Sequence, residues 1–273
     1  MKYLNIGCGS YYSMESTWTN LDFVSLDKHV IAHNLLKGIP FNDNSFDFVY
    51  HSHVLEHFSK QDGERLIQEC FRVLKPGGIL RVAVPDLETI VRNYILWLDK
   101  GIENPDDEII RANYNWMLIE LYDQAVRNSS GGEMAKYIFQ EKIINEDFVY
   151  ERIGEEGKGI RKQYLQQRSQ IHNAKFTLKR IVSVVFHILK NIIKSKKASK
   201  FEQIGRFRLG GEIHQWMYDR YSLIGLLTKS GFVQIKKTTT FDSYLTDWGK
   251  YNFDSVQGSV RKPDSLFIEA RKA

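Results

Sequence analysis

The sequence predicts an α/β fold, a doubly wound and mostly parallel sheet with an antiparallel C-terminal edge and a helical insertion. Short apolar runs alternate with helically spaced segments over residues 1–86, which is typical of βαβ units with right-handed crossovers. Residues 87–210 then read almost entirely as helix. Strand-like runs return at 233–240 and 265–271, close enough in sequence to pair antiparallel. We expect residues 1–86 and 211–273 to form one domain and 87–210 to form a helical cap.

The individual elements follow from apolar spacing and from turn residues. Further strands are expected at 2–6, 19–24, 30–36, 45–50 and 79–84. A helix is expected from about Val54 to the turn Lys75-Pro76-Gly77-Gly78. Later helices are expected after Asp86, which can cap a helix that Gly101 ends, and then at 106–128, 134–144 and 218–229.

Composition and cysteine content indicate an ordinary globular protein. Of its 273 residues, 42% are hydrophobic and 26% are charged. The two cysteines, Cys8 and Cys70, give neither a disulfide framework nor metal-ligand spacing, which favours a reduced, cytoplasmic setting. We expect no signal peptide, and the most apolar later stretch, 181–193, is too short and too interrupted to cross a bilayer.

Charge is distributed unevenly along the chain. The net charge is +5, yet the stretch from Lys158 to Arg208 holds fourteen Lys or Arg and one acid, Glu202, and so carries +13. Within it, apolar residues at helical spacing beside lysines predict a basic amphipathic helix over 178–197. It can be a core helix of the cap, a peripheral anchor at the inner face of the membrane, or a nucleic-acid patch. Nucleic acid is least favoured, because aromatic residues are not interleaved with the cations, and membrane contact predicts salt-sensitive binding to anionic liposomes.

A glycine turn, Gly7-Cys8-Gly9, follows the first strand, and Asp22 lies near the end of the second. A parallel sheet presents backbone N–H groups to a nucleotide-like ligand in this way. A dinucleotide site would need a third glycine, but positions 10–13 are Ser, Tyr, Tyr and Ser. Between Gly7 and Asp22 there is also no Lys or Arg to bind a pyrophosphate. These features count against an NAD enzyme.

The turn has companions in a fixed order: Asn5-Ile6-Gly7-Cys8-Gly9, Asn20-Leu21-Asp22, Pro40-Phe41, Ser45-Phe46-Asp47, Val54-Leu55-Glu56-His57 and Arg72-Val73-Leu74-Lys75-Pro76-Gly77-Gly78. This set resembles the class I S-adenosylmethionine-dependent methyltransferases. The resemblance implies S-adenosylmethionine as the cofactor, with its methionine part over the turn and its ribose hydroxyls on Asp22. The implied cofactor contacts are Asn5, Gly7, Cys8, Gly9, Asp22, Asn34, Leu35, His51 and Ser52. The pair Asn34-Leu35 stands where the family usually has Asp-Leu, near the adenine amine.

Later motifs are similar to methyltransferases found among bacterial surface-polysaccharide genes. They are Gly211 to Tyr221, Arg261 to Phe267, and Asp123-Gln124-x-x-Arg127 with Gly131-Gly132. This second resemblance implies O-methylation of a sugar in a surface polysaccharide or in its lipid-linked precursor. A small-molecule or natural-product methyltransferase is the first alternative. The second is a non-catalytic cofactor-binding module that acts at a membrane or on a partner. No feature of the sequence indicates an oligomeric state.

A sugar hydroxyl is a poor nucleophile, so a general base or a metal assists its methylation. The candidate catalytic residues are His53, His57, Asp86 and His214, with His53 favoured because it follows a strand end. His53 and His57 are four apart, but with no third ligand in the pattern we expect no metal. Each of the other three candidates also has a purely structural interpretation. His57 is as easily explained by local packing as by a role in the site, and Asp86 is better explained as a helix cap. His214 can be a loop histidine that is hydrogen-bonded to the backbone. For the pair Asp123 and Arg127, a surface ion pair is preferred over substrate recognition.

Overall fold

The computed structural model describes residues 1–25, 27–173 and 199–273. The basic amphipathic helix predicted over 178–197 lies outside the described residues, so the three interpretations of it stay open. Among the residues that the structure describes, none of the helices is both long enough and apolar enough to cross a bilayer.

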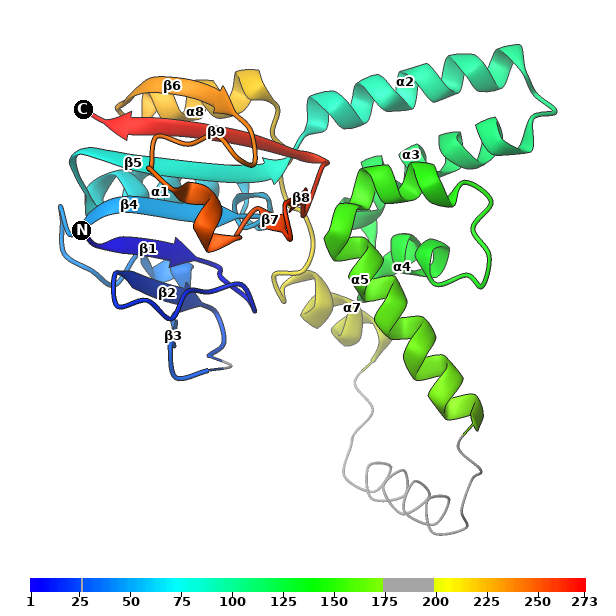
Figure 1. Ribbon diagram of the computed structural model, residues 1–273, viewed down its shortest axis with the longest axis horizontal. Coiled ribbons are helices and arrows are strands. Elements are labelled where there is room, and N and C mark those ends of the chain that lie inside the picture. Colours follow the sequence, from blue (N-terminus) through cyan, green and yellow to red (C-terminus); the bar gives the residue numbers. More distant parts are fainter. Residues whose placement is uncertain (26, 174–198) are drawn as a thin grey trace, which may run out of the picture.

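The centre of the molecule is a seven-stranded sheet with the order β3-β2-β1-β4-β5-β9-β6 (Figure 1). The strands are β1 (Tyr3–Ile6), β2 (Trp18–Asp22), β3 (Val30–Ala32), β4 (Phe46–Ser52), β5 (Leu74–Pro85), β6 (Phe232–Thr238) and β9 (Ser265–Lys272). The first five strands are parallel, and β9 runs antiparallel between β5 and β6. This topology confirms the predicted fold class and the antiparallel pairing of the last two strands.

Helices α1 (Lys60–Val73) and α8 (Arg220–Lys229) cover one face of the sheet. Between β5 and α8 the chain forms α2 (Leu87–Glu103), α3 (Glu108–Val126), α4 (Gly132–Ile138), α5 (Glu146–Asn173) and α7 (Lys200–Arg208). Figure 1 shows this helical block beside the sheet, at the end toward which the parallel strands point. Short elements complete the chain: the 3₁₀ turns η1 (Leu35–Lys37), η2 (Leu55–His57) and η3 (Trp248–Tyr251), and the strands β7 (Ser255–Val256) and β8 (Ser259–Val260).

Three apolar cores among the described residues stabilise the sheet and the helical block. The largest lies between the sheet and helices α1 and α8, where Leu66, Ile67 and Cys70 of α1 meet Leu4 and Ile6 of β1. Burial of such apolar surface is the main favourable term in folding. The helical block has a separate core around the fully buried Trp116 and Met117. That separate core supports our proposal that residues 87–210 form a cap.

The second face of the sheet is covered differently, by an aromatic cluster. Tyr3, Trp18, Phe48 and Tyr50 point from the strands toward Trp248 and Phe253, which belong to the segment between β6 and β9. Neighbouring rings meet mostly edge to face, with Trp18 and Phe253 centroids 4.9 Å apart, an arrangement that aromatic quadrupoles favour. This segment therefore closes a face that helices often cover in doubly wound sheets.

A buried arginine fastens that segment. Arg81 of β5 is fully buried, and its guanidinium contacts Asp254 at 2.9 Å and Glu269 at 2.9 Å. It also donates to the carbonyl oxygen of Thr239 at 2.7 Å and stacks on Trp248. Each charge is thus paired and hydrogen-bonded, which is the condition for burying ions without a large penalty.

Several expected boundaries were wrong. Helix α1 begins at Lys60 and not near Val54, because Ser59 caps it by accepting from the N–H of Asp62. The expected turn at residues 75–78 lies within β5, whose Leu74 pairs with Phe46. Helix α2 continues past Gly101 to Glu103, and the third helix of the block ends at Ile138 instead of residue 144. Helix α5 begins before the basic stretch and extends into it, and α7 lies within it; neither had been assigned bounds from the sequence, although residues 87–210 were expected to be almost entirely helical.

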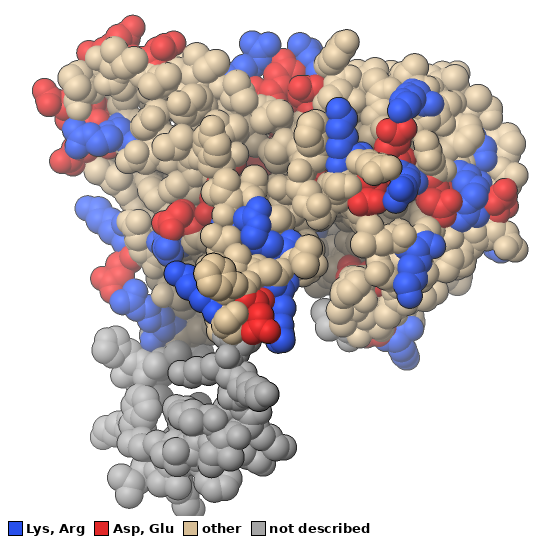
Figure 2. Space-filling model, turned by 180° about the vertical axis from the view of Figure 1, so that it is seen from behind, with Lys and Arg blue, Asp and Glu red and all other residues tan. Residues whose placement is uncertain are grey.

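On the face shown in Figure 2, Lys and Arg side chains are interspersed with Asp and Glu. Ion pairs along α5 show the same mixing, for example Arg161 with Glu146 at 2.6 Å and Lys158 with Glu155 at 2.8 Å. The Lys and Arg side chains of the described residues therefore do not form a single basic patch on this face.

Replacing Arg81 by Met should destabilise the protein by about 3–5 kcal/mol, because Asp254 and Glu269 would remain buried without their counter-ion. Urea unfolding followed by circular dichroism measures this loss. The matched control is Arg92→Met, since Arg92 pairs with Glu88 on the surface and should change stability by less than about 0.5 kcal/mol. A loss below about 1 kcal/mol for Arg81→Met would show that the buried pairs do not hold the segment.

Candidate functional site

The site lies where the strand order reverses. From β1 the chain continues to β2 on one side, while β4 pairs on the other, and open α/β sheets bind ligands outside the carboxyl ends of strands at such a switch point. A cavity of about 240 Å³ is found there. Its lining combines the glycine turn after β1, the end of β4, and Arg261 and Lys262 before β9. Glu156 of α5 completes it from the helical block.

The glycine turn requires glycine at its first position. Gly7 has φ of 64°, and a Cβ there would lie 2.3 Å from Cγ2 of Val54, which a packed core does not allow. Gly9 has φ of 53°, and no atom lies within 4 Å of where its Cβ would be. The outer side of the turn is thus open to a ligand, while its inner side packs against Val54.

Asp22 stands directly beside the turn. Its Oδ2 accepts a hydrogen bond from the N–H of Gly9 at 2.7 Å, and the half-buried carboxylate keeps further lone pairs for a ligand. The N–H groups of Gly7 and Cys8 donate to the carbonyl oxygen of Leu21. These contacts bring the end of β2 and the turn together, as the sequence pattern predicted.

Asn5 and Cys8 also line the cavity, each with a partly structural task. Asn5 is buried, and its side-chain amide donates to the carbonyl oxygen of Tyr11 at 2.9 Å, which holds the loop after the turn. Burial, followed by the nearby charge of Asp22, raises the pKa of the Cys8 thiol to about 12. The thiol is therefore protonated at neutral pH and acts as a small apolar group.

The residues at the end of β4 divide between the cavity and the core. Ser52 and His53 line the cavity. His51 is fully buried between Ile6 of β1 and Val82 of β5, and neither ring nitrogen has a hydrogen-bond partner among the described residues. Burial lowers the pKa of His51 to about 4. Of the two predicted contacts here, Ser52 faces the cavity whereas His51 is not part of its lining.

His53 connects the cavity with a buried carboxyl group. Its Nε2 lies 2.8 Å from Oγ of Ser265 and its Nδ1 lies 3.2 Å from Oε1 of Glu56. Burial lowers the pKa of His53 and raises that of Glu56 to about 8. Both side chains are thus uncharged at neutral pH, so we treat this contact as a neutral pair rather than an ion pair. His53 has φ of 54°, a left-handed conformation that histidine adopts more readily than most residues.

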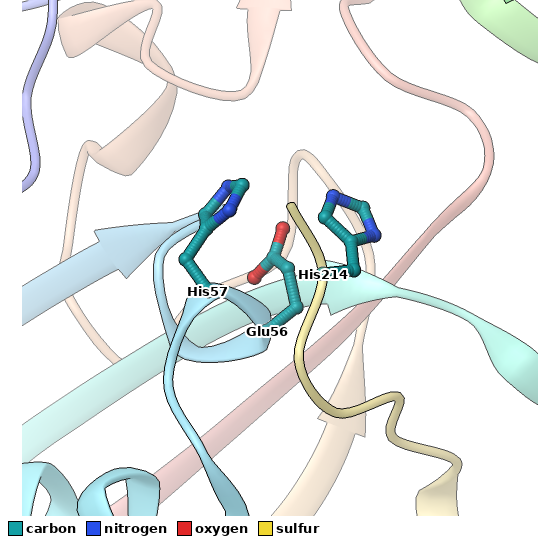
Figure 3. A group of neighbouring side chains, drawn as sticks. All are labelled: Glu56, His57 and His214. Atoms are coloured by element: carbon teal, nitrogen blue, oxygen red, sulfur yellow. The ribbon is translucent and has the colours of Figure 1, made fainter. Parts of the chain in front are cut away.

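Glu56 also faces two further histidines (Figure 3). Ligand-capable atoms of Glu56, His57 and His214 lie within 4.8 Å of one another. Glu56 and His57 belong to the turn η2, and His214 comes from the segment before α8 (Figure 3). His57 and His53 do not share a helical face as expected, because η2 is a single 3₁₀ turn. The structure instead supplies a neighbour that is 157 positions away in sequence.

The histidines of this group are held in different ways. Nδ1 of His57 lies 3.2 Å from the carbonyl oxygen of Ile213, and the rings of His57 and His214 meet edge to face at 5.0 Å. Burial lowers the pKa of His57 and lowers that of His214 to about 3. The backbone N–H of His214 donates to the carbonyl oxygen of Gln124, which ties this residue to α3.

Three other predicted site residues lie apart from the cavity lining. Asp86 is the N-cap of α2, with Oδ1 accepting from the N–H groups of Glu88 and Thr89 and Oδ2 from the Thr89 hydroxyl. Asn34 caps η1 by accepting from the N–H of Leu36, and Leu35 packs against the main core. The capping expected of Asp86 is confirmed.

The expectation of a surface pair at Asp123 and Arg127 was wrong. Both side chains are largely buried, and their charged atoms are 3.8 Å apart. Asp123 accepts from the N–H of Glu133 at the start of α4, and a Cβ on Gly132 would lie 2.3 Å from its carboxylate. Arg127 pairs with Glu212 at 3.0 Å. The pair thus joins α3, α4 and the segment that carries His214.

Sequence reasoning missed Glu56, Glu156, Arg261 and Lys262 as site residues. Arg261 stacks over Tyr11 with 4.0 Å between its guanidinium carbon and the ring centroid, and its Nε lies 3.6 Å from Glu156. Lys262 Nζ lies 3.4 Å from the same carboxylate. A signal was present for Glu56, Arg261 and Lys262, which stand inside motifs that we had singled out, but no motif contains Glu156, and the roles of all four depend on contacts across the fold.

Comparison with known families matches residues 4–82 to the family described as a methyltransferase domain. Among curated proteins, a probable S-adenosylmethionine-dependent methyltransferase of Mycolicibacterium smegmatis is 41% identical over 56 residues, which are 20% of this chain and 21% of that protein. The chain thus spans about a fifth of the length of this relative. The matched family region holds the glycine turn, Asp22 and the η2 turn.

Solved structures give more distant likenesses. A SAM-dependent methyltransferase of Thermotoga maritima, described as a possible histamine N-methyltransferase, aligns with a TM-score of 0.39 at 14% identity over 100% of this chain and 82% of that one. A SAM-dependent methyltransferase of Archaeoglobus fulgidus aligns with a TM-score of 0.39 at 13% identity, over 99% and 86%. Likenesses at this level carry no argument about what this chain does.

Replacing His51 by Leu should remove part of the acid sensitivity of the protein. With a folded pKa of about 4 and an unfolded value near 6.5, His51 binds more proton in the unfolded state, so stability falls as pH drops from about 6.5 to 4. Between pH 7 and pH 5 the wild type should lose about 2 kcal/mol more than His51→Leu.

Urea titrations at the two pH values measure that difference. His29→Leu is the control, because His29 is exposed and the substitution should leave the pH dependence unchanged. Parallel pH profiles of the wild type and His51→Leu would rule out a neutral buried imidazole at this position.

Proposed function

We propose that the chain is an S-adenosylmethionine-dependent methyltransferase. The observation that carries this proposal is the glycine turn anchored on Asp22 at the switch point of the sheet, within the region matched to a methyltransferase domain. The curated relative that is 41% identical over 56 residues is named a probable S-adenosylmethionine-dependent methyltransferase, which supports the same cofactor here. The cofactor is S-adenosylmethionine, and when bound it supplies an electrophilic methyl group on a sulfonium.

The residues present fit this cofactor. Asp22 offers its carboxyl oxygens as acceptors to a pair of ribose hydroxyls, which are donors and need no cation beside them. Gly9 leaves open space where a larger residue would fill the approach. Cys8 contributes a buried thiol to the cavity lining, and Val54 packs beneath Gly7 and supports the turn from the core side.

For the acceptor we propose a sugar hydroxyl in a surface polysaccharide or its lipid-linked precursor. Support comes from the similarity of residues 211–221 and 261–267 to methyltransferases of such gene clusters, and from the place of these segments in the structure. Lys262 and Arg261 line the cavity and His214 lies beside Glu56. Residues from the similar segments therefore lie at the side of the cavity that faces the helical block.

A hydroxyl acceptor must lose its proton, and His53 is placed to receive it. His53 lines the cavity, and burial keeps its imidazole neutral at physiological pH, so one ring nitrogen carries a lone pair. The ring nitrogens face Ser265 and Glu56, so an acceptor hydroxyl has to take the place of the Ser265 hydroxyl beside Nε2. Glu56 at 3.2 Å and Ser265 at 2.8 Å fix the plane of the ring. We assign the proton acceptor role to His53 and a positioning role to Asp86, whose oxygens are used in capping α2.

Cofactor binding is tested with S-adenosylhomocysteine in a thermal-shift assay. At about 100 times the dissociation constant the ligand should stabilise the wild type by about 2.7 kcal/mol. Asp22→Asn should bind about 10- to 100-fold more weakly, because a charged acceptor for the ribose hydroxyls is lost while the contact to Gly9 is kept. Asp106→Ala, at an exposed loop position, is the control and should bind like the wild type. Absence of any shift in the wild type would contradict the proposal.

Transfer is tested with labelled S-adenosylmethionine and a panel of free sugars, nucleotide sugars and lipid-linked oligosaccharides. We expect label in a methyl ether, located by NMR, and a kcat about 10²–10⁴-fold lower in His53→Asn. Asparagine tolerates the left-handed backbone at this position, so the variant should fold and should bind S-adenosylhomocysteine normally. His29→Asn is the control. Label in N-methyl groups would contradict a hydroxyl acceptor, and an unchanged kcat would exclude His53.

A further inference from the structure

A buried carboxyl group without a hydrogen bond needs an explanation. Glu56 is fully buried, and neither of its carboxylate oxygens has a partner with hydrogen-bond geometry among the described residues. Nearly all buried polar atoms in proteins are satisfied, and an unsatisfied one commonly marks a missing ligand or a functional group. The carboxyl group points toward the rings of His57 and His214, as Figure 3 shows.

The two histidines supply the second observation. His214 is buried, and its Nδ1 has no hydrogen-bond partner among the residues that the structure covers. His57 can donate its Nδ1–H to the carbonyl oxygen of Ile213 at 3.2 Å, which leaves Nε2 unprotonated. Metal-bound histidines typically donate their other ring N–H to a carbonyl or carboxylate in this way. The group therefore presents lone pairs from three side chains to one small volume.

We propose that Glu56, His57 and His214 form a binding site for a divalent transition-metal cation such as Zn²⁺ or Mn²⁺. Two imidazoles and one carboxylate are the protein ligands of a known class of catalytic zinc sites, which leave a further position open for water or substrate. Imidazole donors favour such ions over Mg²⁺ or Ca²⁺, which prefer oxygen ligands. His53, at 3.2 Å from Glu56, orients the carboxylate from the side of the cavity.

The geometry is compatible with an ion after a small movement. The three ligand atoms lie within 4.8 Å of one another, whereas donors at about 2.0–2.2 Å from one ion are separated by about 3.0–3.5 Å. Binding an ion therefore needs the three donor atoms to approach by about 1 Å. Glu56 and His57 share one turn, so the approach of His214 is the adjustable distance, and the segment before α8 carries it.

Cations near the group are already paired. Lys262 lies 3.4 Å from Glu156, Arg261 lies 3.6 Å from the same residue, and Arg127 pairs with Glu212 at 3.0 Å. These side chains repel a bound metal ion less than unpaired cations would, because each has a carboxylate beside it. The same arrangement keeps these side chains out of the space between the three ligands.

The site adjoins the cofactor cavity, because His53 contacts Glu56 and also lines that cavity. A bound cation at such a position can hold an acceptor hydroxyl and lower its pKa. This role in the reaction rests on the proposed function, whereas binding of the metal does not. The two are therefore tested by separate measurements.

Metal binding is tested on the tag-free full chain after treatment with a chelator. Titration calorimetry with ZnCl₂ and with MnCl₂, and elemental analysis after dialysis, should give one ion per chain for at least one of the two metals. Glu56→Gln and His214→Gln should each weaken the dissociation constant at least about 100-fold, because a ligand is lost. Glu103→Gln and His29→Gln change exposed residues of the same types and should bind as the wild type does.

Far-UV circular dichroism of the same proteins serves as the check of folding, and S-adenosylhomocysteine binding is measured separately. If Glu56→Gln does not fold, His214→Gln and the visible absorption of the Co²⁺-loaded wild type carry the test, since histidine ligation gives a spectrum that the variant should lose. No bound ion at 1 mM Zn²⁺ or Mn²⁺, or equal affinity in the variants, would overturn the inference. Metal binding without S-adenosylhomocysteine binding would support the metal site and refute the proposed function. S-adenosylhomocysteine binding without metal binding would refute the metal site and leave the proposed function unaffected.

Discussion

The arrangement of the sheet depends on the buried charge of Arg81. Its guanidinium joins Asp254, Glu269 and backbone carbonyls of the segment after β6, and so holds the aromatic cover of one sheet face in place. The network continues to the cavity, because the hydroxyl of Tyr50 donates to Asp254 at 2.6 Å and Tyr50 lines the cavity. One set of paired charges thus fixes the far side of β4, the strand whose end supplies Ser52 and His53. Since removing one member of such a network leaves the others buried and unpaired, the cover and the site are linked in stability.

A second set of contacts places the helical block on the sheet. Glu156 of α5 meets Arg261 and Lys262, and Arg127 of α3 meets Glu212. The backbone N–H of His214 donates to the carbonyl oxygen of Gln124 in α3, while the N–H of Gln215 donates to the backbone carbonyl oxygen of Glu56 at 2.8 Å. The segment before α8 thus contacts α3 on one side and η2 on the other, and these contacts place His214 beside Glu56. The site is shared between the part that binds the cofactor in our proposal and the part that we expect to recognise the acceptor.

Local patterns predicted the cofactor side of the site better than the opposite side. The order of Gly7, Gly9 and Asp22 reflects neighbouring strands, so spacing along the chain is enough to place them together. His214 and Glu56 meet across 158 positions, and no periodicity encodes that distance. Helix α1 was placed too early because the apolar residues Val54 and Leu55 continue the helical pattern, although Ser59 with Asp62 gave a capping signal. Arg81 looked like an interruption in an apolar strand, since its partners lie more than 150 residues further along.

The structure also shows where the charge excess of the sequence is neutralised. On α5, Lys158, Arg161 and Arg168 pair with Glu155, Glu146 and Glu141. Arg208 of α7 donates instead to carbonyl oxygens at the end of α3. These cations serve contacts within the helical block, and an anionic partner would have to compete with them. Residues 174–198, by contrast, contain seven Lys or Arg and no acid in the sequence. The paired cations of α5 have their charge offset by neighbouring carboxylates, so the excess of positive charge that remains in the sequence is concentrated in residues 174–198.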